Sequence, residues 1–440
     1  MSKISFIVLL LLLVSVGTVP YAVYLGIPLV PHLFGSMLLC MGLGLIFLLL
    51  SRDSDKLSAW AYKHVLIAIF FRLGLLNLLL AMSQFKGVSI YGFFDDEFYE
   101  RAWAVGELAD TRNIYGGVAT FLGGLFGDYS ALILRQTNIV LSTFVAFPAI
   151  RILQRFGANE KAARMAVLLL LYLPYAAAHS IFAIKDIISA LLLTVSLSLI
   201  VSIRVEHDPK PESNSAILRI LLLLGLSLLL EGLRTGQGFA IMATALLGVA
   251  LQSRARIPVP LVALLLMLVL ALLGGWAFSR SDAYLLHAER YLRWISTQVA
   301  DGDFRAFFVI DTFAEVWKAP FAFVAYLLGP IPQPGLTGRV MIDTGGWLKM
   351  LDFPVLIFVI AGLWRLRLRL LPFFLPVLVP LLLSAIWNVT NFRAQIAYYP
   401  ALFVLFGMLL DQAPQHLRRR QVGSLLFSGL AVVFVVYRLT

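Results

Sequence analysis

The sequence predicts an all-α membrane protein that crosses the bilayer about thirteen times. Of its 440 residues, 60% are hydrophobic and only 13% are charged, and the mean hydropathy is +0.90. A soluble domain is typically about 45–50% apolar and about 25% charged. The apolar residues also gather in runs of about 17–25, the length that an α-helix needs to span a bilayer. These observations predict a single integral membrane domain over residues 1–440.

The apolar runs follow one another along the chain and define the predicted helices in order. They cover residues 4–25, 33–50, 64–82, 131–150, 163–182, 187–203, 217–231, 236–252, 258–279, 353–364 with its neighbours, 370–387, 395–411 and 421–438. The first run follows Lys3 like the core of a signal peptide, but no small-residue cleavage site comes after it. We therefore interpret it as a retained helix, which forms with the second run an N-terminal two-helix extension over residues 1–63.

The basic residues predict the orientation of these helices. With the N-terminus in the cytoplasm, the inside loops hold 19 Lys and Arg residues and the short outside segments hold eight, the bias expected of a multi-pass protein of the inner or plasma membrane. The net charge of +11 would also suit nucleic acid, but the basic residues are dispersed at helix ends, so we expect no nucleic-acid partner. Because 17 of the 24 acidic residues fall outside, we expect the active site to face outward.

Two long segments lie on the predicted outer face. Residues 83–130 form an acidic loop, in which a short amphipathic helix follows the acids and a Gly-rich part lies along the membrane surface. Residues 280–352 contain two stretches of aromatic and charged residues that favour helices, 284–299 and 304–317. The Gly/Pro-rich loop 328–335 then precedes Arg339, and loops of this kind often cover a site.

The sequence gives no support to several classes of function. It contains no P-loop, HExxH, GxSxG or dinucleotide fingerprint, so an ATP-driven or zinc-protease function lacks support. The single cysteine, Cys40, excludes an intramolecular disulfide and a cysteine-based metal cluster.

The densest group of charges on the outer face is acidic. Asp95, Asp96 and Glu97 are consecutive and lie among aromatic residues. An unpaired charge near hydrocarbon costs several kcal/mol, so these acids need water, a cation, a substrate or a partner. They are candidates for a general base, or for oxygen ligands of a divalent cation. The alternative is a solvated loop, or ion pairs with Arg101 and Arg112.

Three cations stand beside the predicted outer ends of helices that run inward. Lys185 precedes the sixth helix, Arg234 the eighth and Arg393 the twelfth. A helix N-terminus presents free N–H groups and a positive dipole end, so together with a cation it suits a phosphate or diphosphate headgroup. The alternative is that these side chains reach out to ordinary lipid phosphates.

Two further polar residues have less specific interpretations. Arg72 lies within the third helix, where an ionisable residue is a functional candidate, although it can also reach the interface or pair locally. We leave it unassigned. His179 precedes Lys185 by six residues, and a lone histidine in such a place is more often a hydrogen-bonded interface residue than a ligand.

Two short motifs resemble those of the GT-C superfamily of polytopic glycosyltransferases, and in particular its family-39-type members. The stretch Asp95-Asp96-Glu97-Phe98-Tyr99, with Ala102 after it, resembles their D-E-x-x-Y motif in an outer loop. The segment 391–403, which is basic and aromatic and then leads into an apolar helix through Pro400, resembles a late region of these enzymes that helps to bind the lipid phosphate. The acidic loop of the family usually follows the first helix, whereas here two further spans precede the helix that the loop follows.

The resemblance implies a GT-C-like fold and transfer of a sugar from a polyprenyl-(di)phosphate donor to a glycan, lipid or protein acceptor at the membrane. Matching on Tyr99 puts the catalytic aspartate at Asp95, and matching on an Asp–Glu pair puts it at Asp96; Glu97 is the third candidate. A divalent cation is an optional cofactor, and we assign no metal ligands. The candidate substrate-binding residues are Tyr99, Lys185, Asp186, Arg234, Gln237, Arg339, Arg393 and Tyr398.

Two alternatives remain at this stage. The first is a polysaccharide polymerase or ligase that joins lipid-linked oligosaccharides, which only the size of its products would distinguish. The second is a secondary transporter or lipid flippase, which would be expected to show inverted repeats and access from both faces. The sequence contains no evident internal repeat.

Overall fold

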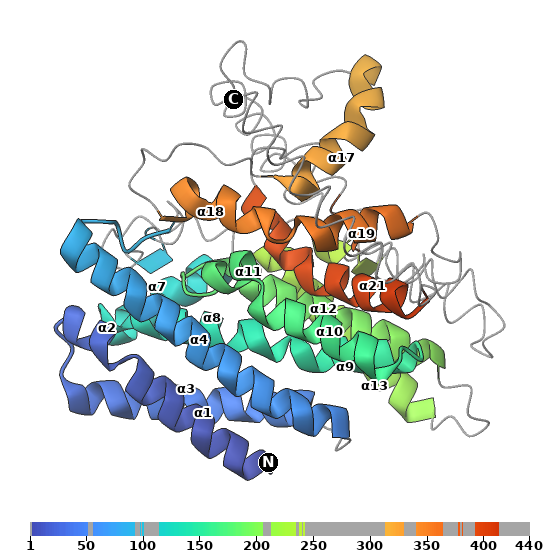
Figure 1. Cartoon of the computed structure of the whole chain (residues 1–440). Helices are drawn as coiled ribbons and strands as arrows, with labels where there is room; N and C mark the ends of the chain where they lie inside the picture. Colours follow the sequence, from blue (N-terminus) through green and yellow to red (C-terminus); the bar gives the residue numbers. More distant parts are fainter. Residues whose placement is uncertain are drawn as a thin grey trace, which may run out of the picture. The chain divides into compact units, whose positions relative to one another are not determined.

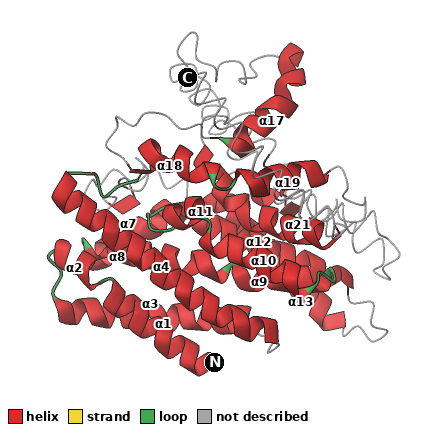
Figure 2. Cartoon of the chain, viewed as in Figure 1, coloured by secondary structure: helices red, strands yellow, loops and turns green. Residues whose placement is uncertain are grey.

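The computed structural model describes residues 2–51, 56–92, 97, 99–100, 114–205, 213–234, 237–239, 241–242, 313–329, 340–363, 377–378, 381 and 392–412. Throughout these residues every regular element is a helix and there is no strand, as Figure 2 shows. The all-α fold class is therefore confirmed for the described part of the chain.

The helices have the following bounds. Up to residue 205 they are α1 (Lys3–Gly17), α2 (Val19–Tyr24), α3 (Leu29–Leu50), α4 (Lys56–Lys86), α7 (Ile114–Phe126), α8 (Tyr129–Phe144), α9 (Ala146–Arg155), α10 (Glu160–Tyr172), α11 (Pro174–His179) and α12 (Lys185–Val205). After it they are α13 (Ser213–Leu233), the 3₁₀ helix η2 (Phe313–Lys318), α17 (Ala319–Leu328), α18 (Val340–Met350), α19 (Phe353–Leu363), the 3₁₀ helix η3 (Phe392–Tyr398) and α21 (Tyr399–Gln412).

Five helical stretches are long and apolar enough to cross a membrane. They are Lys3–Tyr24, Leu29–Leu50, Leu57–Lys86, Tyr129–Arg155 and Lys185–Ser202, and they coincide with the first four predicted runs and the sixth. Large apolar side chains such as Val8, Leu45 and Phe70 are exposed on α1, α3 and α4, as a helix face against lipid requires. The total of thirteen spans stays a prediction.

The chain divides into two compact units. Unit 1 comprises the described residues within 1–198, 331–365 and 396–440, and unit 2 comprises those within 199–330 and 366–395. Most residues that the sequence marked for function and that the structure describes belong to unit 1.

Helix α8 lies at the centre of unit 1. It packs against α3, α4 and α7, while α1 packs against α3 and α4, and Figure 1 shows α1, α3 and α4 running side by side. Nearly every side chain of α8 is buried. Its Gln136 donates hydrogen bonds to Thr18 Oγ1 at 2.7 Å and to Ser36 Oγ at 2.8 Å. The predicted two-helix extension, residues 1–63, thus packs into unit 1 through polar as well as apolar contacts.

Two predicted helices have different bounds in the structure. The predicted span 163–182 is broken, because α10 ends at Tyr172, Leu173 is extended (ψ 128°) and Pro174 opens α11. A proline lacks the N–H of a continuing helix and pushes the preceding residue out of the α region. The helix expected to begin near Gln395 begins at Tyr399, after the 3₁₀ turns of η3, with Pro400 in its first turn.

Unit 2 contains α13, η2 and α17. The side chain of Gln395, at the end of this unit's last segment, donates from Nε2 to the carbonyl of Tyr326 and lies 3.5 Å from that of Gly329. These carbonyls belong to the last turn of α17 and to the residue after it, where no helical N–H remains to satisfy them. Gln395 thus caps α17.

Candidate functional site

Of the three consecutive acids, Glu97 lies within the described residues. Asp95, Asp96 and Arg339 lie outside the described residues. Arg393 lies in η3, and its side chain is also outside the description. Glu97 is partly exposed and Tyr99 is buried. The described part of the candidate site therefore consists of the residues that flank Asp95 and Asp96.

A buried ion pair holds the chain on both sides of the acids. Arg135 Nε, on α8, lies 2.5 Å from Glu100 Oε1, and the two side chains are 0% and 2% exposed. Arg135 Nη2 donates to Glu100 Oε2 at 3.2 Å and to the Ile90 carbonyl at 3.0 Å. Because Ile90 and Glu100 bracket the acidic stretch, one guanidinium fixes both of its ends on α8.

The same helix holds the turn that leads into α12. Asn138 Nδ2, one turn beyond Arg135, donates to the carbonyls of Phe182 at 2.7 Å and Ile184 at 2.9 Å. Gly92 lies so close to this turn that a Cβ there would come within 2.7 Å of the Phe182 ring. The acidic stretch and the predicted cation-bearing helix start therefore meet at α8.

The predicted substrate-binding residues nearest this meeting point occupy different environments. Helix α12 begins at Lys185, as predicted, and Lys185 is partly exposed, whereas Asp186 is fully buried. Tyr99 packs edge-on against Tyr115 of α7, with ring centroids 4.8 Å apart. We call the region formed by residues 90–92, 97, 99–100, 135–138 and 181–186 the motif end of unit 1.

A second buried polar cluster joins α18, the turn before α19, and α21. Lys349 Nζ donates to the Tyr399 hydroxyl, which donates to Asp352 Oδ2 at 2.8 Å. All three side chains are at most 1% exposed, and Lys349 Nζ lies 4.9 Å from the ring centroid of Tyr175 on α11. The phenol thus stands between an amine and a carboxyl group, an arrangement that can pass a proton.

Burial dominates the electrostatics of this cluster. It raises the pKa of Asp352 to about 7, although Lys349 and the hydrogen bond from Tyr399 favour the carboxylate. It lowers the pKa of Lys349 to about 7, and Asp352 opposes that shift. Desolvation disfavours each charged form, so burial moves the pKa values of both groups towards neutrality.

The predicted residues Tyr398 and His179 of unit 1 are also buried. Tyr398 is 1% exposed in the last turn of η3. His179 is also 1% exposed, and its Nδ1 lies 2.7 Å from the Tyr175 carbonyl, within hydrogen-bonding distance.

Arg234 and Gln237 lie together in unit 2. The N–H of Gln237 donates to the Arg234 carbonyl at 3.1 Å, and Glu231 Oε2 accepts from the N–H of Phe239 at 3.2 Å. The turn is so tight that a Cβ on Gly238 would lie 1.9 Å from the Ser227 carbonyl oxygen. The structure thus brings these two predicted residues together in one turn at the end of α13.

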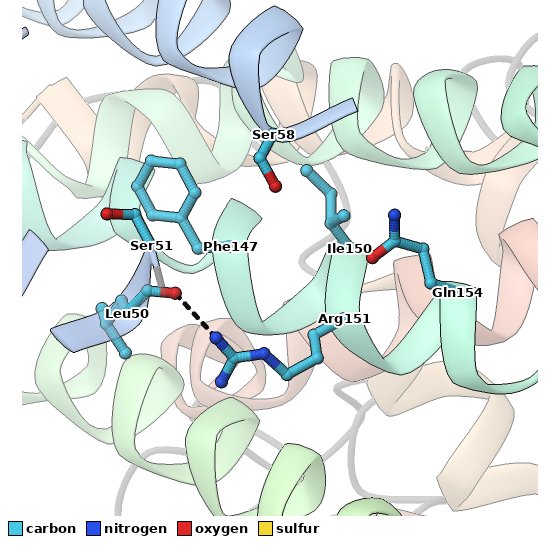
Figure 3. Close-up of a pocket in the computed structure, with 7 residues that line it drawn as sticks. All are labelled: Leu50, Ser51, Ser58, Phe147, Ile150, Arg151 and Gln154. Carbon is cyan, nitrogen blue, oxygen red and sulfur yellow. Dashed lines mark hydrogen bonds between the residues drawn. The ribbon is translucent and has the colours of Figure 1, made fainter. Parts of the chain in front are cut away.

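The opposite end of unit 1 has a simpler polar structure. A cavity of about 10 Å³ lies here, with Ser51, Ser58 and Gln154 on its walls. Arg151 Nη2 donates to the Leu50 carbonyl at 3.0 Å, and Figure 3 shows how these residues lie. Nearby in sequence, Glu160 and Arg164 form an ion pair whose side chains are 57% and 42% exposed. We call residues 50–51, 56–58, 151–164 and 411 the anchor end.

The sequence reasoning missed the residues that organise the motif end and the second cluster. Arg135 and Asn138 lie three residues apart inside a run interpreted as a span, a spacing that puts both on one helix face. Lys349 and Asp352 show the same spacing at the end of the outer segment 280–352. Two polar residues at positions i and i+3, within or next to an apolar run, could therefore have indicated both groups of residues from the sequence.

Among the described residues, no group of three His, Cys, Asp or Glu side chains could hold a metal ion. No protein-family model, curated protein or solved structure matches the chain.

Proposed function

We propose that this protein is a membrane-embedded glycosyltransferase of the GT-C type, which transfers a sugar from a polyprenyl-(di)phosphate donor to an acceptor on the outer face. One observation carries the proposal: Arg135 and Asn138 hold the acidic stretch and the start of α12 at a common place on α8. An acid and a cation next to a helix N-terminus are the groups that such a transfer needs.

In the proposed reaction, Asp95 or Asp96 takes the proton from an acceptor hydroxyl. The acceptor oxygen then bonds to the anomeric carbon as the bond from that carbon to the phosphate oxygen breaks. The (di)phosphate leaves with the bonding electrons, and Lys185 at the N-terminus of α12 stabilises its charge. Because phosphate is already a good leaving group, a divalent cation is optional.

The proposed topology has thirteen spans and the motif end outward. The contacts at the two ends of unit 1 support this topology. At the motif end, residues of predicted outer segments contact one another, and Arg135 binds Ile90 and Glu100. Residues of predicted inner segments meet at the anchor end, where Arg151 binds Leu50 and Asn159 binds Asp411. A cysteine-accessibility experiment with intact cells, on single cysteines placed at Lys86 and Lys161 in a Cys40→Ala background, tests this orientation: only the first should react with an impermeant reagent.

The test of activity uses the purified full chain with a radiolabelled lipid-linked sugar and a crude acceptor fraction. We expect Asp95→Asn or Asp96→Asn to lower transfer by about 10²–10⁴-fold, the usual contribution of a general base. Arg164→Gln, at the anchor end, is the matched control and should keep full activity. If both aspartate variants transfer sugar at the wild-type rate, the assignment of the base is wrong.

The same assay distinguishes the alternatives. Long glycans as products would indicate a polymerase or ligase. Accumulation of the lipid-linked sugar inside proteoliposomes without any covalent product would indicate a transporter or flippase, and would contradict the proposed transfer.

A further inference from the structure

Arg72 is a buried cation inside a candidate membrane span. It lies near the middle of α4 and is 1% exposed. In the described part of the chain, no carboxylate pairs with its guanidinium. An arginine side chain does not lose its proton in proteins, so this charge must be balanced by other means.

One edge of the guanidinium has a clear structural role. Arg72 Nη1 donates to the carbonyl of Leu171 at 2.8 Å and to that of Ala68 at 3.1 Å. The Leu171 carbonyl belongs to the last turn of α10, where the break before Pro174 removes the helical N–H partners. Arg72 therefore caps α10, and the partial negative charge of that helix end offsets part of the positive charge.

The other edge of the guanidinium, formed by Nε and Nη2, does not take part in capping α10. Nε is buried and has no hydrogen-bond acceptor, and Nη2 takes part in neither of the two bonds above. Nε and Nη2 form the side-on fork with which arginine binds anions through two parallel N–H donors. A buried donor without an acceptor is costly, so this edge indicates a missing partner.

A cavity lies next to Arg72. Its walls are formed by Arg72, Ser142 and Tyr399 and by apolar residues of α10, α11 and α12. All of these lining residues belong to unit 1. It has about 20 Å³ of free space, which is enough for about one or two small particles of the size of water. A lipid diphosphate does not fit in such a volume.

We propose that Arg72 and this cavity form a binding site for a small monovalent anion of the size of chloride. The anion accepts hydrogen bonds from the Nε–Nη2 edge and balances the charge that the end of α10 offsets only in part. By binding there it ties α4 to the broken helix α10–α11. This site is separate from the proposed sugar transfer, and its test needs no donor or acceptor.

The first measurement is the unfolding temperature of the full chain in detergent at constant ionic strength, with chloride replaced by gluconate, which is too large for the cavity. At chloride concentrations about 100 times its dissociation constant, we expect a midpoint about 3 °C higher in chloride for a chain of this size. Arg164→Gln, which removes a surface arginine at the anchor end, should keep the full chloride dependence. An unchanged wild-type midpoint would mean that the cavity holds water only, and would overturn the proposal.

Two variants assign the effect to Arg72. Arg72→Lys keeps the charge and removes the side-on fork, so we expect it to lose at least half of the chloride dependence, and Arg72→Gln should lose all of it. Either variant overturns the proposal if it retains the wild-type dependence. If neither variant folds, crystals of the wild-type chain can be soaked in bromide instead. Anomalous density for bromide in the cavity beside Arg72 would support the proposal, and its absence would refute it.

Discussion

The two ends of unit 1 use the same chemical pair in opposite ways. At the motif end, Glu100 and Arg135 are almost completely buried and fix two separate segments of the chain. At the anchor end, Glu160 and Arg164 are one helical turn apart and about half exposed to solvent. A buried pair leaves an uncompensated charge when one partner is removed, whereas water screens an exposed pair. The buried pair should therefore stabilise the fold much more than the exposed pair.

The largest effect is expected from Arg135→Met. It leaves the Glu100 carboxylate buried without its partner and removes the donor to the Ile90 carbonyl, so we expect a loss of about 3–5 kcal/mol in the free energy of unfolding. Chemical unfolding of the detergent-solubilised chain measures it. The double variant Glu100→Gln/Arg135→Met should recover part of the loss, and a double variant as unstable as the single one would contradict the role given to the ion pair.

A smaller effect is expected from Tyr399→Phe. The change keeps the ring and removes the hydroxyl that receives a bond from Lys349 and donates to Asp352. Loss of that hydroxyl leaves buried polar groups with fewer partners, so we expect about 1–3 kcal/mol of destabilisation by the same measurement. Tyr24→Phe, on a tyrosine that is 40% exposed, is the matched control. A Tyr399→Phe variant as stable as this control would show that the cluster does not depend on the hydroxyl.

The pH dependence of stability should reflect the titration of Asp352 and Lys349 in the same cluster. The folded state raises the pKa of Asp352 from 3.8 to about 7, so it holds a proton that the unfolded state has lost, and stability falls as pH rises from about 4 to 7. Lys349 has its pKa lowered from 10.5 to about 7, so it contributes the opposite slope, and stability rises between about pH 7 and 10.5. Each slope is at most about 1.4 kcal/mol per pH unit.

The variant Asp352→Asn isolates one of these two slopes. Its unfolding midpoint should vary less than that of the wild type between pH 4 and 7, because the titrating carboxyl group is gone. The Arg164→Gln chain, altered only at the anchor end, should follow the wild-type profile. Identical profiles for Asp352→Asn and the wild type would contradict the raised pKa.

The smallest effect is expected from Arg164→Gln itself. Its partner Glu160 is 57% exposed, and an exposed pair at i and i+4 typically contributes about 0.3–0.5 kcal/mol. Unfolding in low and high salt measures this difference, which should vanish at high salt. A loss approaching that of Arg135→Met would show that exposure does not explain the difference between the two ends.

Composition and periodicity were enough to predict the helical class and the start of α12 at Lys185, because apolar runs and a charged boundary are local features of the chain. The break at Pro174 was also readable from a local signal, yet the run 163–182 was interpreted as one helix because its residues are uniformly apolar. The partners of Arg135 lie 35 and 45 residues away, at Glu100 and Ile90. No local pattern predicts contacts of that kind, since packing in three dimensions decides them.

The polar character of α8 bears on how the chain enters a membrane. This helix contains Arg135, Gln136 and Asn138, and it belongs to the least apolar of the five candidate spans. Alone in lipid, these side chains would lack acceptors and donors, at a cost of several kcal/mol each. The earlier helices α1 and α3 supply Thr18 and Ser36, and the acidic segment supplies Glu100. Gln136 thus finds its partners in segments made before α8, whereas Asn138 finds its partners in Phe182 and Ile184, which are made after it.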